Sequence, residues 1–109
     1  MVARAAKEYC EKIGDDVAAL TRAELDISDE AAVQAAVAEL RPDAILNLAA
    51  FTDVDGAEAQ VEACNAANVA GVRNLALAAV EHGVRFVTVS TDYVFSGEKE
   101  GFYTEDDVP

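Results

Sequence analysis

The sequence predicts an α/β fold with a doubly wound parallel sheet. Segments with helical apolar spacing alternate along the chain with short apolar runs that are typical of strands, and such alternation favours parallel strands joined by helices. The run at residues 44–50 (AILNLAA) is almost continuously apolar, as expected for a strand covered on both faces. The 109 residues contain no linker or repeat and suit a single domain over residues 1–109.

The first half of the chain is predicted to contain two helices and two short strands. Apolar residues at helical spacing predict a helix over residues 2–13. The apolar run at residues 17–20 predicts a short strand, and residues 25–27 allow another. Ser28 is the predicted N-cap of the second helix, and Pro42 lies beyond its end.

The second half is predicted to contain one long helix and a final strand. A polar connection at residues 51–56 follows the strand at 44–50, and a helix is expected from about residue 59 to residue 82. Gly71 within it is unfavourable by about 1 kcal/mol relative to alanine, which predicts close packing at this point. Gly83 is expected to end the helix before a strand at residues 85–90 and an acidic loop.

The composition limits the classes of partner. No apolar run is long enough to span a membrane and no signal peptide is recognisable, so no membrane partner is expected and the expected location is cytoplasmic. The net charge of -13, from 21 acidic and 8 basic residues, predicts no nucleic-acid partner, because phosphates require a basic surface.

The few potential metal ligands do not form a recognisable site. Cys10 and Cys64 are far apart in the sequence, and His82 is the only histidine. A zinc site needs about four ligands at typical spacing. No metal is therefore predicted, both cysteines are expected to be partly buried thiols, and His82 is assigned to the end of its helix.

Small or polar residues follow three of the predicted strands. The carboxyl ends of parallel strands meet at one edge of an open sheet, where such folds bind ligands, so these clusters are expected to lie together. Alanines there would let a flat cofactor approach the backbone, and a threonine hydroxyl can donate a hydrogen bond to a substrate carbonyl. The three clusters are Thr21–Arg22, Ala49–Ala50–Phe51 and Ser90–Thr91–Asp92.

Several segments resemble the dTDP-4-dehydrorhamnose reductase family of extended short-chain dehydrogenases/reductases. They are LNLAAFTDVDGAE at 46–58, NVAGVRNLA at 68–76, VSTDYVFSGE at 89–98 followed by FYTEDDVP at 102–109, and RAELDISD at 22–29. The resemblance covers essentially the whole chain. It implies an NAD(P)-binding Rossmann-like domain.

The resemblance also implies a reaction and a set of site residues. The reaction is NADPH- or NADH-dependent reduction of the C4 ketone of dTDP-4-dehydro-6-deoxy-L-mannose in dTDP-L-rhamnose biosynthesis, so the expected partner is a nucleotide sugar, and a homo-oligomer is left open. Thr91 matches the catalytic hydroxyl that orients and polarises the ketone, and Asp92 is implied to contact the sugar. Arg22 would suit a 2′-phosphate and favour NADPH. The other residues implied to contact the cofactor are Asp26 and Ile27 at the adenine, Ala49, Ala50, Phe51 and Val89.

Two motifs of the family are not found in these residues. Its proton donor is a tyrosine with a lysine four residues later, and Tyr9, Tyr93 and Tyr103 all lack that lysine. The glycine spacing that binds the pyrophosphate after the first strand is also not found. We therefore expect the first strand and the C-terminal part of the domain to lie outside this chain, and the chain alone to be inactive.

The expected absence of the first strand has a structural consequence. In the Rossmann order 3-2-1-4-5-6 that strand lies between the second and the fourth. Without it, the strands at 17–20 and 44–50 would face a gap with unpaired edges. We expect the isolated chain either to be marginally stable or to pair these two strands directly.

Simpler structural roles compete with the functional ones. Thr91 can cap the loop after its strand, Asp92 can form an Asx turn, and Asp26 can support the N-cap of the second helix. Asn47 is expected to be a buried amide with satisfied hydrogen bonds. Asn68 is expected to hold the loop after the strand at 44–50.

A second function stays open beside the reductase. Relatives of this family serve as non-catalytic regulatory subunits of methionine adenosyltransferase. A regulatory subunit of the same fold, which binds a partner without reducing a sugar, is therefore the alternative.

Overall fold

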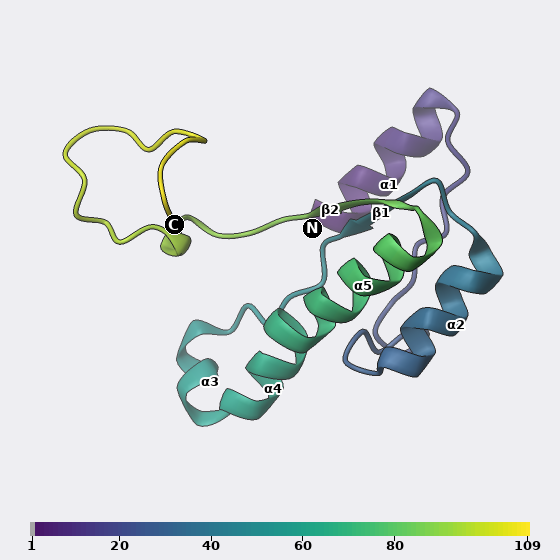
Figure 1. The fold of residues 1–109 in the computed structure, drawn as a ribbon, viewed down its shortest axis with the longest axis horizontal. Helices are drawn as coiled ribbons and strands as arrows, with labels where there is room; N and C mark the ends of the chain where they lie inside the picture. The colour runs from purple at the N-terminus through teal and green to yellow at the C-terminus, as the bar shows by residue number, and fades with distance from the viewer. Residues whose placement is uncertain (1) are drawn as a thin grey trace.

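The computed structural model describes residues 2–109, except for the side chain of Asp92. Helices cover one side of a small sheet, and the C-terminal residues extend away from this body (Figure 1). The elements in chain order are α1 (Val2–Ile13), α2 (Glu30–Leu40), β1 (Ala44–Asn47), α3 (Val54–Ala59), α4 (Val61–Asn65), the π-helical segment η1 (Ala66–Gly71), α5 (Val72–His82), β2 (Arg85–Thr88) and the 3-10 helix η2 (Asp92–Val94).

The sheet of the described chain consists of β1 and β2, which pair in parallel. The register places Ala44 opposite Arg85 and Asn47 opposite Thr88. Helices α3 to α5 form the connection between the two strands, as parallel pairing requires. The prediction of an α/β unit with parallel strands is confirmed for this pair. Both strands end earlier than predicted, at residues 47 and 88.

The core lies between α2, α5 and one face of the sheet. Its buried members are Val33 and Val37 from α2 and Leu75 and Ala78 from α5. Ile45 and Phe86, which are partners in the sheet, pack against this cluster. The next pair along, Leu46 and Val87, lies on the other face and is 48% and 55% exposed.

The expectation that the strand at residues 44–50 is covered on both faces is thus wrong for the described chain. Side chains alternate between the faces of a strand, so one layer of helices can bury only every second residue. Helices α2 and α5 supply that one layer. An apolar run in the sequence indicates a surface that can be covered, and it does not show what covers it.

The N-cap of helix α2 lies one residue later than predicted. The carboxylate of Asp29 accepts a hydrogen bond from the backbone N of Ala32 at 3.0 Å, which makes Asp29 the N-cap. Ser28, the predicted cap, instead donates from its backbone N and its hydroxyl to the Asp26 carboxylate. Both residue types are good caps, so the sequence does not separate the two positions.

Helices α4 and α5 are continuous through η1, which confirms the predicted long helix with a π-helical segment in its middle. The prediction of close packing at Gly71 is also confirmed. A Cβ atom there would lie 2.5 Å from Cγ1 and Cδ1 of Ile27. Gly83 ends α5 with a φ of 68°, in the left-handed region that favours glycine.

Residues 17–20 form no strand in the structure, contrary to the prediction. A strand is stabilised by the ladder of hydrogen bonds to a neighbour, and the described part of the chain provides no ladder here. Direct pairing of residues 17–20 with β1 is wrong as well, because the sheet of the described chain contains β1 and β2 alone and leaves the other edge of β1 unpaired. Residues 25–27 likewise lie in a turn and loop segment.

The two ends of the described chain extend away from the core. Helix α1 has no buried residue, and residues after β2 run out to a separate loop (Figure 1). In this loop Phe95 stacks on Tyr103 with ring centroids 4.4 Å apart, and Lys99 pairs with Asp107. The radius of gyration is 15.5 Å, against about 13 Å for a compact domain of this size, because these ends are extended.

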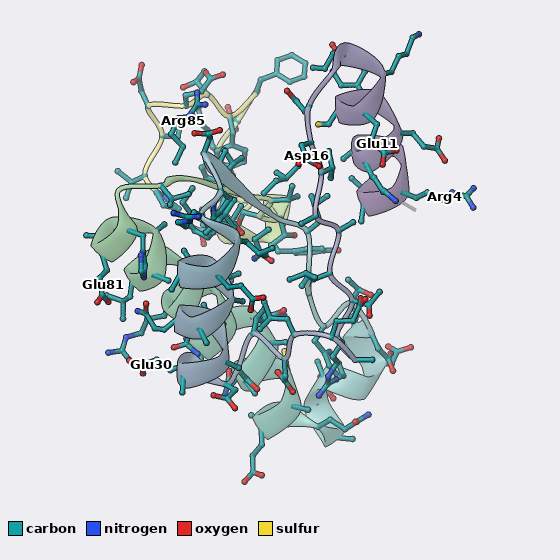
Figure 2. The ribbon with its side chains drawn as sticks, turned by 90° about the vertical axis from the view of Figure 1, so that its right-hand side faces the viewer. Arg4, Glu11, Asp16, Glu30, Glu81 and Arg85 are labelled. Carbon is teal, nitrogen blue, oxygen red and sulfur yellow. The ribbon has the colours of Figure 1, made fainter. Side chains whose placement is uncertain are left out.

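The outer surface of the helices carries charged side chains and also exposed apolar ones, such as Val80 on α5. Figure 2 shows Arg4 on α1 and Glu81 on α5 pointing away from the ribbon. Among the described residues, no helix combines the length and the apolar character needed to cross a membrane.

Candidate functional site

The carboxyl ends of β1 and β2 bring two of the three predicted clusters to one edge of the sheet. The backbone N of Val89 donates to the carbonyl of Asn47 at 3.2 Å, so the two chains are still paired as they leave the strands. Ala49 and Ala50 follow from one strand, and Thr91 follows from the other. The alanines and the hydroxyl therefore lie at the same edge, as the parallel arrangement predicted.

Asn47 fixes the start of this edge from inside the protein. It is only 5% exposed, and its Nδ2 donates to Oγ1 of Thr88 at 3.1 Å across the strand pair. Its Oδ1 accepts from the backbone N of Ala49 at 3.1 Å. The prediction of a buried amide with satisfied hydrogen bonds is confirmed, and one of these bonds orients the alanine segment.

Asn68, in η1, holds the end of the same segment. Its Oδ1 accepts from the backbone N of Phe51 at 2.8 Å, and its Nδ2 donates to the carbonyl of Phe51 at 3.1 Å. The expected role of Asn68 in holding this loop is confirmed. Ala49, Ala50 and Phe51 are thus fixed at both ends by side-chain amides, while the two alanines remain exposed.

The cluster after β2 is exposed. Val89 is 62% exposed, and Thr91 also lies at the surface. Oγ1 of Thr91 accepts a hydrogen bond from the backbone N of Tyr93 at 3.3 Å, so the simpler role of stabilising the turn is present in the structure. The sugar contact predicted for Asp92 involves a side chain that is outside the described part of the structure.

The third predicted cluster, Thr21–Arg22, does not end a strand. The carboxylate of Glu24 accepts from the backbone N and from the hydroxyl of Thr21, both at 2.7 Å, and closes a turn. The hydrogen bond from the Thr21 backbone lowers the pKa of Glu24 most, and the bond from the Thr21 hydroxyl lowers it further. The side chain of Arg22 is 84% exposed and lies 3.8 Å from the Asp26 carboxylate.

Asp26, Ile27 and Ser28 form a second part of the candidate site, which we call the 26–28 turn. The Asp26 carboxylate accepts from the Ser28 hydroxyl at 2.6 Å and from the Ser28 backbone N at 3.0 Å. These bonds, followed by the charge of Arg22, hold the pKa of Asp26 below its ordinary value. The expected supporting role of Asp26 near the start of α2 is therefore observed, although the cap itself is Asp29.

Sequence reasoning missed one residue that contacts this turn. Asn74, in α5, is 5% exposed, and its Nδ2 donates to the carbonyls of Ile27 at 3.0 Å and of Ser28 at 3.2 Å. An asparagine directly before the buried Leu75 of a predicted helix was the available signal. A polar side chain at such a position must find partners, because an unpaired buried amide is costly.

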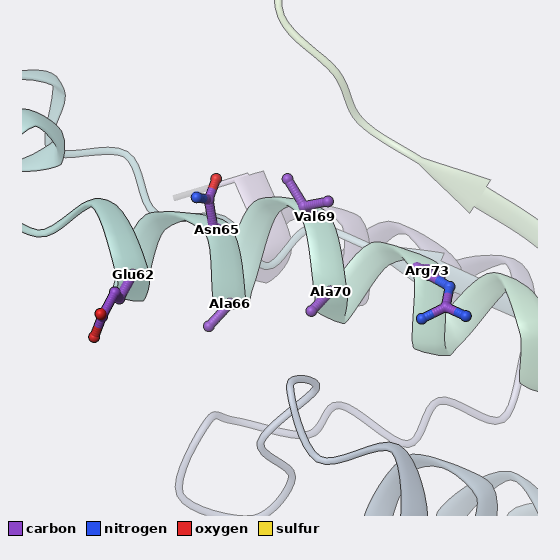
Figure 3. A pocket seen from close by; sticks show the side chains of 6 residues that line it. All are labelled: Glu62, Asn65, Ala66, Val69, Ala70 and Arg73. Carbon is purple, nitrogen blue, oxygen red and sulfur yellow. The ribbon is translucent and has the colours of Figure 1, made fainter.

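An open hollow also lies along the outer side of the long helix, away from the predicted residues. Figure 3 shows its lining side chains, which come from α4, η1 and α5. None of them is among the predicted site residues. The hollow is shallow and open, so we assign the candidate site to the strand ends and the 26–28 turn. The lining residues are Glu62, Asn65, Ala66, Val69, Ala70 and Arg73.

The residues at the strand ends fit a flat cofactor. Ala49 and Ala50 are exposed and carry no side-chain atom beyond Cβ, so a planar group can approach the backbone. Arg22 provides an exposed cation beside the 26–28 turn. Among the residues that the structure describes, no group of three or more His, Cys, Asp or Glu side chains is placed to hold a metal ion.

Comparisons with known proteins agree on one family. The family model described as the RmlD substrate binding domain matches residues 1–109. A dTDP-4-dehydrorhamnose reductase from Aggregatibacter actinomycetemcomitans is 44% identical over 93 residues, which cover 85% of this chain and 32% of that protein. The reductase of the same name from Streptomyces griseus is 43% identical over 106 residues, which cover 97% of this chain and 35% of that protein.

The similarity extends to three-dimensional structure. The crystal structure of a dTDP-4-dehydrorhamnose reductase from Bacillus anthracis in complex with NADP matches with a TM-score of 0.89 and 35% identity, over 97% of this chain and 38% of that one. The chain thus spans about a third of the length of the relatives it matches. Its parallel strand pair and covering helices are consistent with part of the Rossmann-like fold of these enzymes. The chain belongs to the family described as the RmlD substrate binding domain.

Proposed function

We propose that this chain forms part of an NADPH-dependent reductase that converts dTDP-4-dehydro-6-deoxy-L-mannose to dTDP-L-rhamnose. The observation that carries the proposal is the parallel pairing of β1 with β2, which brings Ala49 and Ala50 to the same edge as Thr91. The names of the relatives and the NADP in the Bacillus anthracis structure support it. Residues 1–109 are proposed to act as one partial domain.

In this proposal the residues at the strand ends bind and orient the reactants. Thr91 donates a hydrogen bond from its hydroxyl to the C4 ketone oxygen, which orients the ketone and polarises its C–O bond. Asp92, the next residue after Thr91, contacts the sugar. NADPH, when bound, supplies the hydride that C4 receives.

The cofactor is proposed to lie along the edge from Thr91 to the 26–28 turn. Ala49, Ala50, Phe51 and the side chain of Val89 would contact it. Asp26 and Ile27 would lie at its adenine. Arg22 would pair with its 2′-phosphate, which distinguishes NADPH from NADH.

The 109 residues are proposed to bind reactants without turning them over. The reaction also needs a proton for the C4 oxygen, and the tyrosine–lysine pair that supplies it in the family is not found among these residues. The chain's own contribution is therefore binding and orientation. Sugar reduction by the purified 109-residue chain would contradict this part of the proposal.

Ligand-induced stabilisation tests the binding. The purified chain is melted while far-UV circular dichroism is followed, with and without NADPH. A ligand that binds only the folded state adds about 2.7 kcal/mol at 100 times its Kd, which raises the midpoint clearly. A melt that NADPH leaves unchanged would count against the proposal.

Variants of Thr91 then test its role. Thr91→Ser retains the hydroxyl and is expected to bind the 4-dehydro sugar nucleotide as the natural chain does. Thr91→Val removes the hydroxyl with little change in volume and is expected to weaken that binding about fivefold, the value of one hydrogen bond. NADPH binding serves as the control. Equal sugar-nucleotide binding by the two variants would remove Thr91 from the site.

A further inference from the structure

The 26–28 turn lies outside the helices and the sheet, and its own hydrogen bonds do not attach it to the core. The bonds from Ser28 to the Asp26 carboxylate and from the Asp29 backbone N to the Asp26 carbonyl are all local. The ion pair with Arg22 is local as well and exposed to solvent. These contacts give the turn its shape. They do not determine where it lies relative to the sheet.

Asn74 attaches the backbone of the turn to α5. Its side-chain amide is buried, and Nδ2 donates to the carbonyls of both Ile27 and Ser28. An amide nitrogen has two hydrogens and can make both bonds. The two carbonyls belong to neighbouring residues, so the pair of bonds restricts the orientation of the peptide between them. Asn74 is thus a polar attachment point some 46 residues along the chain from the turn.

Gly71 leaves room for the side chain of Ile27 to pack against the same long helix. A Cβ atom at this position would lie 2.5 Å from two carbons of Ile27, which shows that Ile27 occupies the space that a side chain would fill. Glycine inside a helix is unfavourable by about 1 kcal/mol relative to alanine. Helix stability alone would therefore favour alanine, and the contact with Ile27 explains why glycine fits here.

We propose that Asn74 and Gly71 are positioning residues that hold the 26–28 turn ready for an adenine nucleotide. The inference rests on the proposed function, which assigns Asp26 and Ile27 to the adenine of the cofactor. Ordering the backbone of a free loop costs about 1–2 kcal/mol per residue. A turn that is already held by α5 avoids this cost when the ligand binds, which is the usual benefit of preorganisation.

Isothermal titration with adenosine 2′,5′-bisphosphate tests the proposal on the 109-residue chain. This probe carries the adenine and the 2′-phosphate but no nicotinamide, so it reports on the end of the cofactor that the turn would contact. Asn74→Ala removes both bonds to the turn, and Gly71→Ala pushes Ile27 away while improving helix propensity. We expect each variant to bind the probe about tenfold more weakly, as the loss of one ordered loop contact implies.

A matched variant separates positioning from general destabilisation. Ala79 lies in the same helix, five residues beyond Asn74, and is buried. Ala79→Gly costs about 1 kcal/mol of helix stability and removes no hydrogen bond to the turn, because the alanine side chain makes none. Urea denaturation gives the stability of every variant, and the titration is run where circular dichroism shows each to be fully folded. Ala79→Gly is expected to bind the probe as the natural chain does. If Asn74→Ala does not fold, Gly71→Ala carries the test.

Amide hydrogen exchange supplies a readout at the turn itself. The backbone N–H groups of Ser28 and Asp29, which bond within the turn, should exchange faster in Asn74→Ala than in Ala79→Gly. An Asn74→Ala chain that binds the probe with natural affinity overturns the inference, and so does an Ala79→Gly chain weakened as much as Asn74→Ala. A natural chain that does not bind the probe at all refutes the proposed function, and this inference falls with it.

Discussion

The buried amide of Asn47 allows a quantitative prediction about the strand pair. Asn47→Ala removes the bond to Thr88 Oγ1 and the bond from the Ala49 backbone N, each 3.1 Å long. A hydrogen bond contributes about 1 kcal/mol to stability, so losing two should lower the free energy of unfolding by about 2 kcal/mol. For a domain of this size the midpoint of thermal unfolding should fall by about 10 °C.

Urea denaturation followed by far-UV circular dichroism measures this loss. Asn65→Ala is the matched control, because Asn65 is exposed and its side chain caps no helix. Its stability is expected to change by less than about 0.5 kcal/mol. A double-mutant cycle of Asn47→Ala with Thr88→Val should give a coupling energy of about 1 kcal/mol for the bond between them.

Either of two results would refute this reasoning. If Asn47→Ala costs no more than Asn65→Ala, the amide does not stabilise the strand pair. If the coupling energy between Asn47 and Thr88 is zero while the single substitution is costly, the loss comes from the Ala49 bond or from packing. In that case Asn47 would hold the alanine segment and not the neighbouring strand.

Three further outcomes test other parts of the structure. Arg22→Gln should reduce the preference for NADPH over NADH about fivefold, the effect of one exposed ion pair, whereas Arg85→Gln, at the opposite end of the strands, should leave it unchanged in the same binding assay. Ser28→Ala should raise the pKa of Asp26 toward its ordinary value, because the Ser28 hydroxyl is the main cause of its lowering. Ionised Asp26 stabilises the fold above its ordinary pKa, and on acidification this stabilisation should be lost at a higher pH in the variant. Carboxyl carbon shifts in an NMR pH titration measure the pKa. Val33→Ala, at a position that is 0% exposed, should cost about 2 kcal/mol of unfolding free energy in urea, since it removes two buried methyl groups and leaves a cavity.

Much of the fold could be predicted because local patterns and packing agree. The helix over 72–82, its glycine end at Gly83 and the parallel pair β1–β2 all follow from apolar spacing and from alternation of elements. Gly71 is the clearest case. A residue with poor helix propensity inside a predicted helix required a packing reason, and Ile27 supplies it.

The features that were not predicted depend on contacts between distant residues or on local caps, which apolar spacing does not indicate. Residues 17–20 have the composition of a strand, but a strand needs a neighbour, and no described segment pairs with them. Residues 54–59 were expected to include a loop and instead form α3, where the Asp53 carboxylate accepts from the backbone N of Gly56. That cap could have been recognised, because aspartate is a favoured N-cap.

Part of the candidate site could be predicted from the sequence, and part could not. The cluster at residues 49–51 and the cluster after β2 were placed at one edge by the parallel rule, and the structure brings them there. The attachment of the 26–28 turn by Asn74 was not predicted. It joins residues 46 and 47 positions apart, and no local spacing in the sequence reports on such a contact.

The long connection between β1 and β2 also bears on how quickly this chain folds. The two strands pair across 41 residues, as between Asn47 and Thr88, so the sheet contributes no stability until a large loop has closed. Helix α5 can form from local contacts before that closure and then carry β2 toward β1. The entropic cost of closure grows only slowly, by about 0.6 kcal/mol for each doubling of loop length. Residues inserted between β1 and α3 would therefore slow folding very little, whereas a weakened α5 would delay the step on which the sheet depends.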